Sequence, residues 1–157
     1  MDEQSGRTGD SAREVKSGSG RPHFELVSHT ADVAIEASAP TRSGVFGAVA
    51  DGLAAAHLDS IPDHGSTIEI SVRAESPTAA LFDYLDRLIY VRDVESVLPV
   101  ENRATVREDG DEWVVEATAR GVPLADVAAR EVKAITYSEM ELEAVNGEWH
   151  AYVVVDV

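Results

Sequence analysis

The 157-residue chain is long enough to bury one sizeable hydrophobic core, and its 13 basic and 29 acidic residues give a formal net charge of −16. This acidity argues against direct binding to bare RNA or DNA, because phosphate recognition needs basic patches. The absence of cysteine excludes disulfides, thiolate zinc sites and cysteine nucleophiles. Any metal site must therefore use oxygen or imidazole ligands.

The negative charge belongs to the part of the chain after Pro22. Residues 23–157 hold 9 of the basic and 25 of the acidic residues, and Lys133 is the only lysine among them. At molar salt the Debye length falls to about 3 Å, so repulsion between surface carboxylates is largely screened. We therefore expect a halophilic source, with an ordinary acidic protein as the alternative.

Residues 1–22 contain almost no large apolar side chain, and we expect them to form a disordered polar tail with acidic and basic residues. The tail lacks the apolar segment of a secretory signal, and no run of 18 or more apolar residues occurs anywhere in the sequence. We expect a soluble cytoplasmic protein without membrane association, in which residues 23–157 form a single domain.

The first half of this domain alternates between extended and helical patterns. Residues 24–37 are expected to be extended, with apolar residues at every second position near the end. Thr41 can cap a helix whose apolar face continues to Leu53. A turn at 61–65 leads to residues 67–74, which alternate again and should form a strand.

Ser76 and Pro77 mark the start of a second helix, since serine is a favoured N-cap and proline suits the first helical position. Its broad apolar stripe continues through about residue 92. Strands at 97–106 and 113–119 should pair across a turn at 108–111.

Residues 124–130 are expected to form a short helix. Asn146-Gly147, between extended segments at 140–145 and 149–155, is a strong signal for a tight hairpin. Hairpins with segregated helices predict an α+β fold, with a largely antiparallel sheet and two main helices.

The sequence contains no common catalytic signature such as a Walker loop or a nucleophile elbow. His29 and Asp32, three residues apart near the start of a strand, form the first candidate for chemistry. The structural alternative is that Asp32 caps a turn and His29 is a surface histidine. Three other histidines, His57, His64 and His150, are expected to be ordinary turn or surface residues.

The second candidate is the end of the apolar strand 151–157. Asp156 and the terminal carboxylate of Val157 place two acidic groups close together, and a buried carboxylate needs a partner or a metal. Together with Asp32, such hard oxygen ligands suit Ca²⁺ or Mg²⁺ and not zinc. The alternative is a frayed, solvated terminus.

Lys133 is the third candidate, because a compact ammonium is easily desolvated and this domain otherwise uses arginine. The alternative is the chance retention of a surface lysine.

Three stretches together resemble the signature motifs of the archease family. They are His29-Thr30-Ala31-Asp32-Val33, then Arg130-Glu131-Val132-Lys133-Ala134-Ile135-Thr136-Tyr137, then the end of the chain from Trp149 to Val157. Any one alone is weak, but the three in this order and spacing, with the chain ending one residue after Asp156, are specific. The resemblance spans about residues 23–157.

The resemblance implies a compact α+β domain with a divalent cation site, reported for archeases as calcium. Carried over to this sequence, the ligands are Asp32, Asp156 and the main-chain oxygens of Val157, and Lys133 is the functionally important lysine. Archeases stimulate RtcB-type ligases, which join RNA ends after intron removal from tRNA. They promote GTP-dependent guanylylation of the ligase and support multiple turnover. The resemblance thus implies an accessory protein of an RtcB-type ligase, with no catalytic residues of its own.

Two other functions remain open. A stand-alone metal-dependent phosphate-ester hydrolase would use Asp32, Asp156 and His29, although the sequence offers no second cluster of metal ligands. A chaperone-like acidic scaffold would bind basic partners, and that binding would survive removal of the metal and mutation of Lys133.

Overall fold

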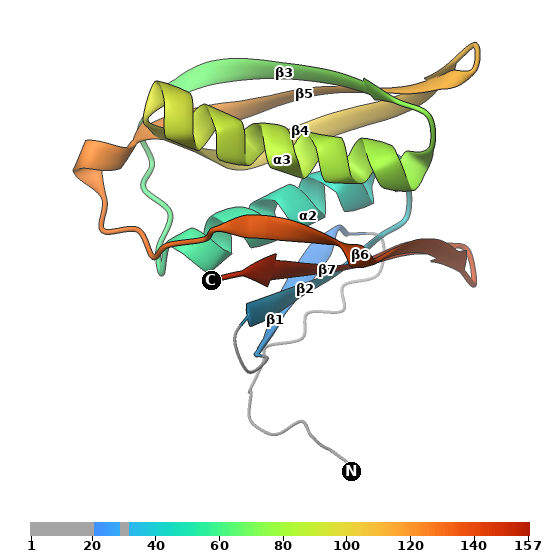
Figure 1. The fold of residues 1–157 in the computed structure, drawn as a ribbon, viewed down its shortest axis with the longest axis horizontal. Coiled ribbons are helices and arrows are strands. Elements are labelled where there is room, and N and C mark those ends of the chain that lie inside the picture. The colour runs from blue at the N-terminus through green and yellow to red at the C-terminus, as the bar shows by residue number, and fades with distance from the viewer. Residues whose placement is uncertain (1–20, 29–31) are drawn as a thin grey trace.

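The structure, a computed structural model, describes residues 21–28 and 32–157 of the chain. Two antiparallel sheets enclose two helices, and each helix contacts strands of both sheets (Figure 1). This arrangement confirms the predicted α+β class. In spatial order, the four-stranded sheet is β1 (His23–Ser28), β2 (Asp32–Ala39), β7 (Glu148–Asp156) and β6 (Ala134–Val145), and the three-stranded sheet is β3 (Ser66–Ala74), β5 (Glu112–Pro123) and β4 (Val97–Asp109).

Both helices begin where the sequence predicts. Helix α2 (Arg42–His57) is capped by Thr41, whose hydroxyl accepts a hydrogen bond from the Gly44 N–H at 2.9 Å. Helix α3 (Pro77–Glu95) starts with proline after Ser76, which is its N-cap. The structure extends both helices a few residues beyond the apolar stripes from which they were predicted, because capping and tertiary contacts fix the ends.

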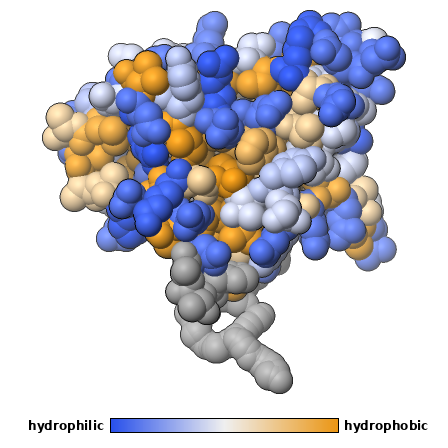
Figure 2. Space-filling model, in the orientation of Figure 1, coloured by the Kyte–Doolittle hydropathy of each residue, from blue (hydrophilic) through white to orange (hydrophobic). Residues whose placement is uncertain are grey.

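The core lies between the two sheets, around the buried faces of the helices. Phe46 of α2 and Tyr84 of α3 are fully buried there, with ring centroids 6.3 Å apart. The inner faces of the strands supply small and branched side chains to the same core, including Ile35, Val115 and Val153. Hydrophilic residues cover much of the face shown in Figure 2, with apolar residues exposed near its middle.

Two predicted hairpins are confirmed. In the β6–β7 turn, Asn146 and Gly147 have φ angles of 53° and 80°, as a type I′ turn requires. In the β4–β5 turn, Gly110 occupies the first central position with a φ angle of 65°. A glycine there suits a type II′ turn.

One prediction about elements was incomplete and another was wrong. The extended stretch at 24–37 is divided into β1 and β2, which pair with each other as an antiparallel hairpin. The short helix expected at 124–130 is only a three-residue 3₁₀ turn, η1 (Leu124–Asp126). After it, residues 127–133 contain neither helix nor strand, because their polar groups bond to other elements instead of to each other.

The tail predicted for residues 1–22 lies almost wholly outside the described residues, so its disorder stays a prediction. His29, Thr30 and Ala31 of the first motif lie outside them too. Neither α2 nor α3 combines the length and the apolar character that a transmembrane helix needs.

Candidate functional site

The ends of three strands meet at one end of the four-stranded sheet. Asp32 begins β2 and lies directly opposite Asp156, which ends the neighbouring strand β7. On the other side of β7, Ala134 at the start of β6 also lies opposite Asp156. Directly opposed residues of antiparallel strands have Cβ atoms about 4.5–5.5 Å apart. The two aspartates, far apart in the sequence, are therefore immediate neighbours.

Both aspartates are on the outer face of the sheet, away from the helices. Ile35, Val153 and Val155 contribute to the core, and side chains alternate between the two faces along each strand. Asp32 and Asp156 have the opposite parity. Asp156 is exposed and Asp32 is half-buried, so both can face a ligand from solvent.

The surroundings of this pair are strongly acidic. The strands β1, β2, β6 and β7 contain no lysine or arginine, and their carboxylates are Glu25, Asp32, Glu36, Glu139, Glu141, Glu143, Glu148 and Asp156. This negative charge affects the pKa of Tyr152, the neighbouring tyrosine on β7. Burial raises the pKa of Tyr152, and the carboxylates of Glu139, Glu36, Asp32 and Glu141 raise it further.

The structure places Lys133 next to Asp156 through the main chain. The Lys133 N–H donates a hydrogen bond to the Asp156 carbonyl oxygen at 2.7 Å, and Lys133 is exposed. Val157, which follows Asp156, is 41% exposed. Asp32, Lys133, Asp156 and Val157, which come from three separate stretches of the sequence, thus lie within one small region.

Arg130, in the segment before Lys133, binds the C-terminal end of α2. Its Nε and Nη2 atoms donate to the carbonyl oxygens of Ala56 and Ala55 at 3.0 and 2.9 Å, and its Nη1 pairs with Asp59 at 2.5 Å. The Arg130 N–H donates to the His57 carbonyl oxygen at 2.8 Å. A guanidinium is well suited to this position, because the last carbonyls of a helix lack partners and carry partial negative charge.

The expectation that His57 is an ordinary turn or surface residue was wrong. His57 closes α2 and is only 2% exposed, with its Nδ1 2.9 Å from the Leu53 carbonyl oxygen. His64 and His150, with side chains 52% and 45% exposed, are surface residues as predicted. The apolar residues around His57 in the sequence could have indicated its burial.

The arrangement around Asp32 and Asp156 fits a hard divalent cation. Two carboxylates and the main-chain oxygens of Val157 would offer the oxygen ligands that Ca²⁺ and Mg²⁺ prefer, and the exposure of Asp156 leaves room for water molecules. Within residues 21–28 and 32–157, no three histidine, aspartate or glutamate side chains gather as potential metal ligands. An ion here would therefore depend on main-chain oxygens and water for the rest of its coordination.

A groove of about 920 Å³ lies elsewhere, between β1, α2 and the bulge of β4. Asp51 of α2, which lines it, accepts hydrogen bonds from the Asn102 N–H and Nδ2 at 2.8 and 3.1 Å. Burial raises the pKa of Asp51, although these bonds act in the opposite direction. Sequence analysis missed this pair, for which an aspartate among the apolar residues of α2 was the available signal.

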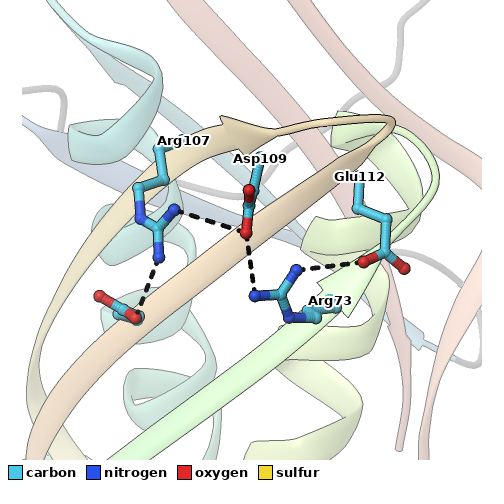
Figure 3. Close-up of polar contacts among 5 residues, drawn as sticks. Arg73, Arg107, Asp109 and Glu112 are labelled. Carbon is cyan, nitrogen blue, oxygen red and sulfur yellow. Dashed lines mark hydrogen bonds and ion pairs between the residues drawn. The ribbon is translucent and has the colours of Figure 1, made fainter.

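The three-stranded sheet is less acidic than the four-stranded sheet, because arginines offset many of the carboxylates on its strands. Arg73, Arg103, Arg107 and Arg120 belong to its strands. Near the β4–β5 turn, Arg73 pairs with Asp109 and Glu112 at 3.0 and 3.1 Å (Figure 3). Half of the arginines after Pro22 are thus on the strands of the sheet that does not carry Asp32 and Asp156.

Comparison with known proteins decides the family. The model of the archease protein family (MTH1598/TM1083) matches residues 24–157. The chain belongs to the archease family. An archease from Methanosarcina mazei is 34% identical over 143 residues, covering 85% of this chain and 95% of the relative. An archease from Pyrococcus furiosus is 29% identical over 141 residues, covering 86% and 96%.

Solved structures of archease relatives share the fold. The solution structure of protein 1598 from Methanobacterium thermoautotrophicum matches with a TM-score of 0.75 and 24% identity, covering 88% of this chain and all of that one. The crystal structure of an archease from Thermotoga maritima, described as a possible chaperone, matches with a TM-score of 0.55 and 21% identity, covering 83% and 94%. Both have the two-helix, antiparallel α+β architecture of the archease domain.

Proposed function

We propose that this chain is a metal-binding accessory protein that activates an RtcB-type tRNA-splicing ligase in the cytoplasm. It promotes GTP-dependent guanylylation of the ligase and supports multiple turnover, and it is not itself the enzyme. Membership of the archease family supports this proposal. The observation that carries it is the meeting of Asp32, Asp156, Val157 and Lys133 at one end of the four-stranded sheet.

The proposed cation is Ca²⁺, with Mg²⁺ as the alternative. The carboxylates of Asp32 and Asp156 and the main-chain oxygens of Val157 would hold it. Like charges directly opposite on paired strands repel each other, and a divalent ion held by both carboxylates would offset that repulsion. When bound, the ion supplies positive charge that can coordinate phosphate oxygens on an otherwise acidic face.

Lys133 contributes an exposed side chain, and its main-chain N–H lies beside Asp156. In the proposal, its ammonium group binds a phosphate of GTP or a carboxylate of the ligase when the two proteins dock. Preorganised charges around a transferring phosphoryl group lower the reaction barrier without a covalent intermediate on this chain. Arginine is a poor substitute there, since its planar guanidinium has a different shape and hydration.

The test is guanylylation of the purified partner ligase by GTP, with wild type, Asp32→Ala and Lys133→Ala. The assay is run at high potassium salt, because the charge of −16 favours a halophilic source. Glu143→Ala is the matched control, since Glu143 is also an exposed carboxylate of the four-stranded sheet. We expect stimulation by wild type and the control, and a loss of about tenfold or more in the other two variants.

If wild type gives no stimulation while the ligase is active alone, the proposal is wrong. Hydrolysis of phosphate esters by the isolated protein would then be measured. Equal stimulation by Asp32→Ala and wild type would contradict the proposed role of the metal. The Lys133→Ala variant would then be the only remaining test of the proposal.

A chaperone-like acidic scaffold is the second candidate, favoured by the carboxylates of the four-stranded sheet. It is distinguished by binding to basic proteins. Binding that survives both chelation of the metal and Lys133→Ala would support the scaffold over the ligase activator.

A further inference from the structure

The segment that carries Lys133 has no secondary structure of its own to hold it. Residues 127–133 connect η1 to β6 and belong to neither a helix nor a strand. Val132 anchors the segment in the core, where its side chain is fully buried. The position of Lys133 therefore depends on a few contacts from neighbouring elements.

One of these contacts comes from a largely buried arginine of α3. Arg92 is in the last turn of the helix, with its side chain only 15% exposed. Its Nη1 donates to the Val132 carbonyl oxygen at 2.6 Å and lies 3.0 Å from Nε2 of His57. One nitrogen of Arg92 therefore connects α3, the end of α2 and the residue before Lys133.

His57 is arranged to accept this hydrogen bond. Its Nδ1 is 2.9 Å from the Leu53 carbonyl oxygen, which can only accept, so Nδ1 carries the proton. Nε2 then has a free lone pair directed at Arg92. Burial lowers the pKa of His57, and the charges of Arg92 and Arg130 lower it further, which favours this neutral form.

We propose that Arg92, with His57 as its buried acceptor, is a positioning residue that fixes Lys133 beside Asp156. This inference rests on the proposed function and deepens it. Arg92 holds the Val132 carbonyl, and the next N–H along the chain, that of Lys133, donates to Asp156. In this role, neither Arg92 nor His57 needs to touch the partner or the reacting phosphate.

Loss of the Arg92 side chain leaves two buried acceptors, the Val132 oxygen and His57 Nε2, without their donor. The segment then gains freedom at the residue before Lys133. A displacement of about 1 Å in a preorganised centre can reduce a rate about 100-fold. Arg92 thus affects activation through geometry, not through the charge that it presents to the ligase.

The first measurement is amide hydrogen exchange of the full chain without any ligase. Arg92→Met keeps much of the apolar stem but removes all donors. Arg87→Met is the matched control, because Arg87 is on the exposed face of the same helix, over the ring of Tyr90. We expect Arg92→Met to speed exchange of the Lys133 amide about tenfold or more, with β7 amides unchanged, and Arg87→Met to match wild type.

The second measurement is ligase guanylylation as a function of the concentration of this chain. Positioning predicts that Arg92→Met lowers the maximal stimulation about tenfold while the half-saturating concentration changes less than about threefold. Arg92→Lys, which keeps the charge but lacks the planar fork, should recover part of that loss. This split distinguishes a displaced Lys133 from general destabilisation.

An unchanged Lys133 amide or full stimulation by Arg92→Met would overturn the proposal. If Arg92→Met does not fold, Arg92→Lys takes its place, and wild-type exchange at Lys133 in that variant would overturn the proposal equally. If wild type does not stimulate the ligase, the proposed function fails, while the exchange measurement still decides whether Arg92 positions Lys133.

Discussion

Asp32 and Asp156 lie directly opposite each other on neighbouring antiparallel strands, one at the start of β2 and the other at the end of β7. Two carboxylates in this relationship repel when both are ionised. The pairing that builds the sheet thus also places side by side the two carboxylates that would hold the proposed cation.

The aspartate pair should make thermal stability depend on a divalent cation. Ca²⁺ added to metal-free protein should raise the melting temperature, since a ligand at about 100 times its dissociation constant stabilises by about 2.7 kcal/mol. Asp32→Asn and Asp156→Asn should abolish the shift, and Glu143→Gln should retain it. Differential scanning fluorimetry with Ca²⁺, Mg²⁺ and a chelator measures this. A shift of equal size in Asp32→Asn would place the ion elsewhere.

Asp51 should contribute to stability as an acceptor and not through its charge. Asp51→Ala leaves the Asn102 N–H without a partner in a partly buried position, so we expect a loss of about 1–3 kcal/mol in the free energy of unfolding. Asp51→Asn keeps an acceptor oxygen and should stay within about 1 kcal/mol of wild type. Urea denaturation at pH 7 compares the three proteins, and equal losses in both variants would contradict this role.

Asp51 should also make the free energy of unfolding depend on pH. Its pKa is raised in the folded protein above the ordinary value of 3.8, so the folded state holds the proton more tightly than the unfolded state. Between these two pKa values, its contribution makes stability fall as the pH rises. The stability of wild type relative to Asp51→Asn should therefore increase as the pH is lowered through that window.

His57 should give the opposite dependence on pH. Its folded pKa is below the ordinary value of 6.5, so the unfolded state takes up a proton first as the pH falls. Protonation of His57 in the fold would also place a charge against Arg92 and Arg130, a repulsion that the carboxylate of Asp93 offsets only in part. Stability should drop as the pH is lowered from about 6.5 toward the folded pKa.

The measurement for His57 is the difference in unfolding free energy between wild type and His57→Gln from about pH 8 to about pH 5, which spans the ordinary histidine range. Glutamine retains an acceptor for Arg92 but does not titrate. Wild type should lose stability relative to the variant as the pH falls below 6.5. A difference that stays constant across this range would contradict a buried neutral His57.

Arg130 should stabilise α2 through its C-terminal carbonyls. Arg130→Lys keeps the charge but cannot reach the Ala55 and Ala56 oxygens and Asp59 together, so we expect a loss of about 1 kcal/mol. Asp59→Asn should cost less, because the Asp59 side chain is 93% exposed and surface ion pairs contribute little. Thermal and urea unfolding compare the two variants, and an equal effect would assign the contribution to the ion pair.

Local sequence patterns correctly predicted the helices and turns whose signals lie within one continuous stretch of the sequence. Helix α3 follows from Ser76, Pro77 and a long apolar stripe, and the β6–β7 turn follows from Asn146-Gly147. The β1–β2 hairpin was missed because residues 24–37 read as extended throughout, without a glycine or proline to mark a turn.

The same distinction holds for the candidate site: local motifs predict single residues, but not the contacts between them. Asp32, Asp156 and Lys133 were named from short motifs, but only strand pairing shows that Asp32 and Asp156 are neighbours. The Arg92–His57–Val132 contacts join three segments that are distant in the chain, and no local pattern encodes such a meeting. Metal binding by the aspartates and a role for Lys133 stay predictions.

The two sheets differ in their distribution of charged residues, so the molecule has an electric dipole. Lysine and arginine are absent from the strands of the four-stranded sheet, while four arginines are in those of the other. At low ionic strength, such a dipole would turn the Asp156 side toward a cationic surface before contact and speed association. At about 1 M salt the field reaches only about 3 Å, so that guidance disappears. In concentrated salt, recognition would then depend on collision geometry and on how long the complex persists.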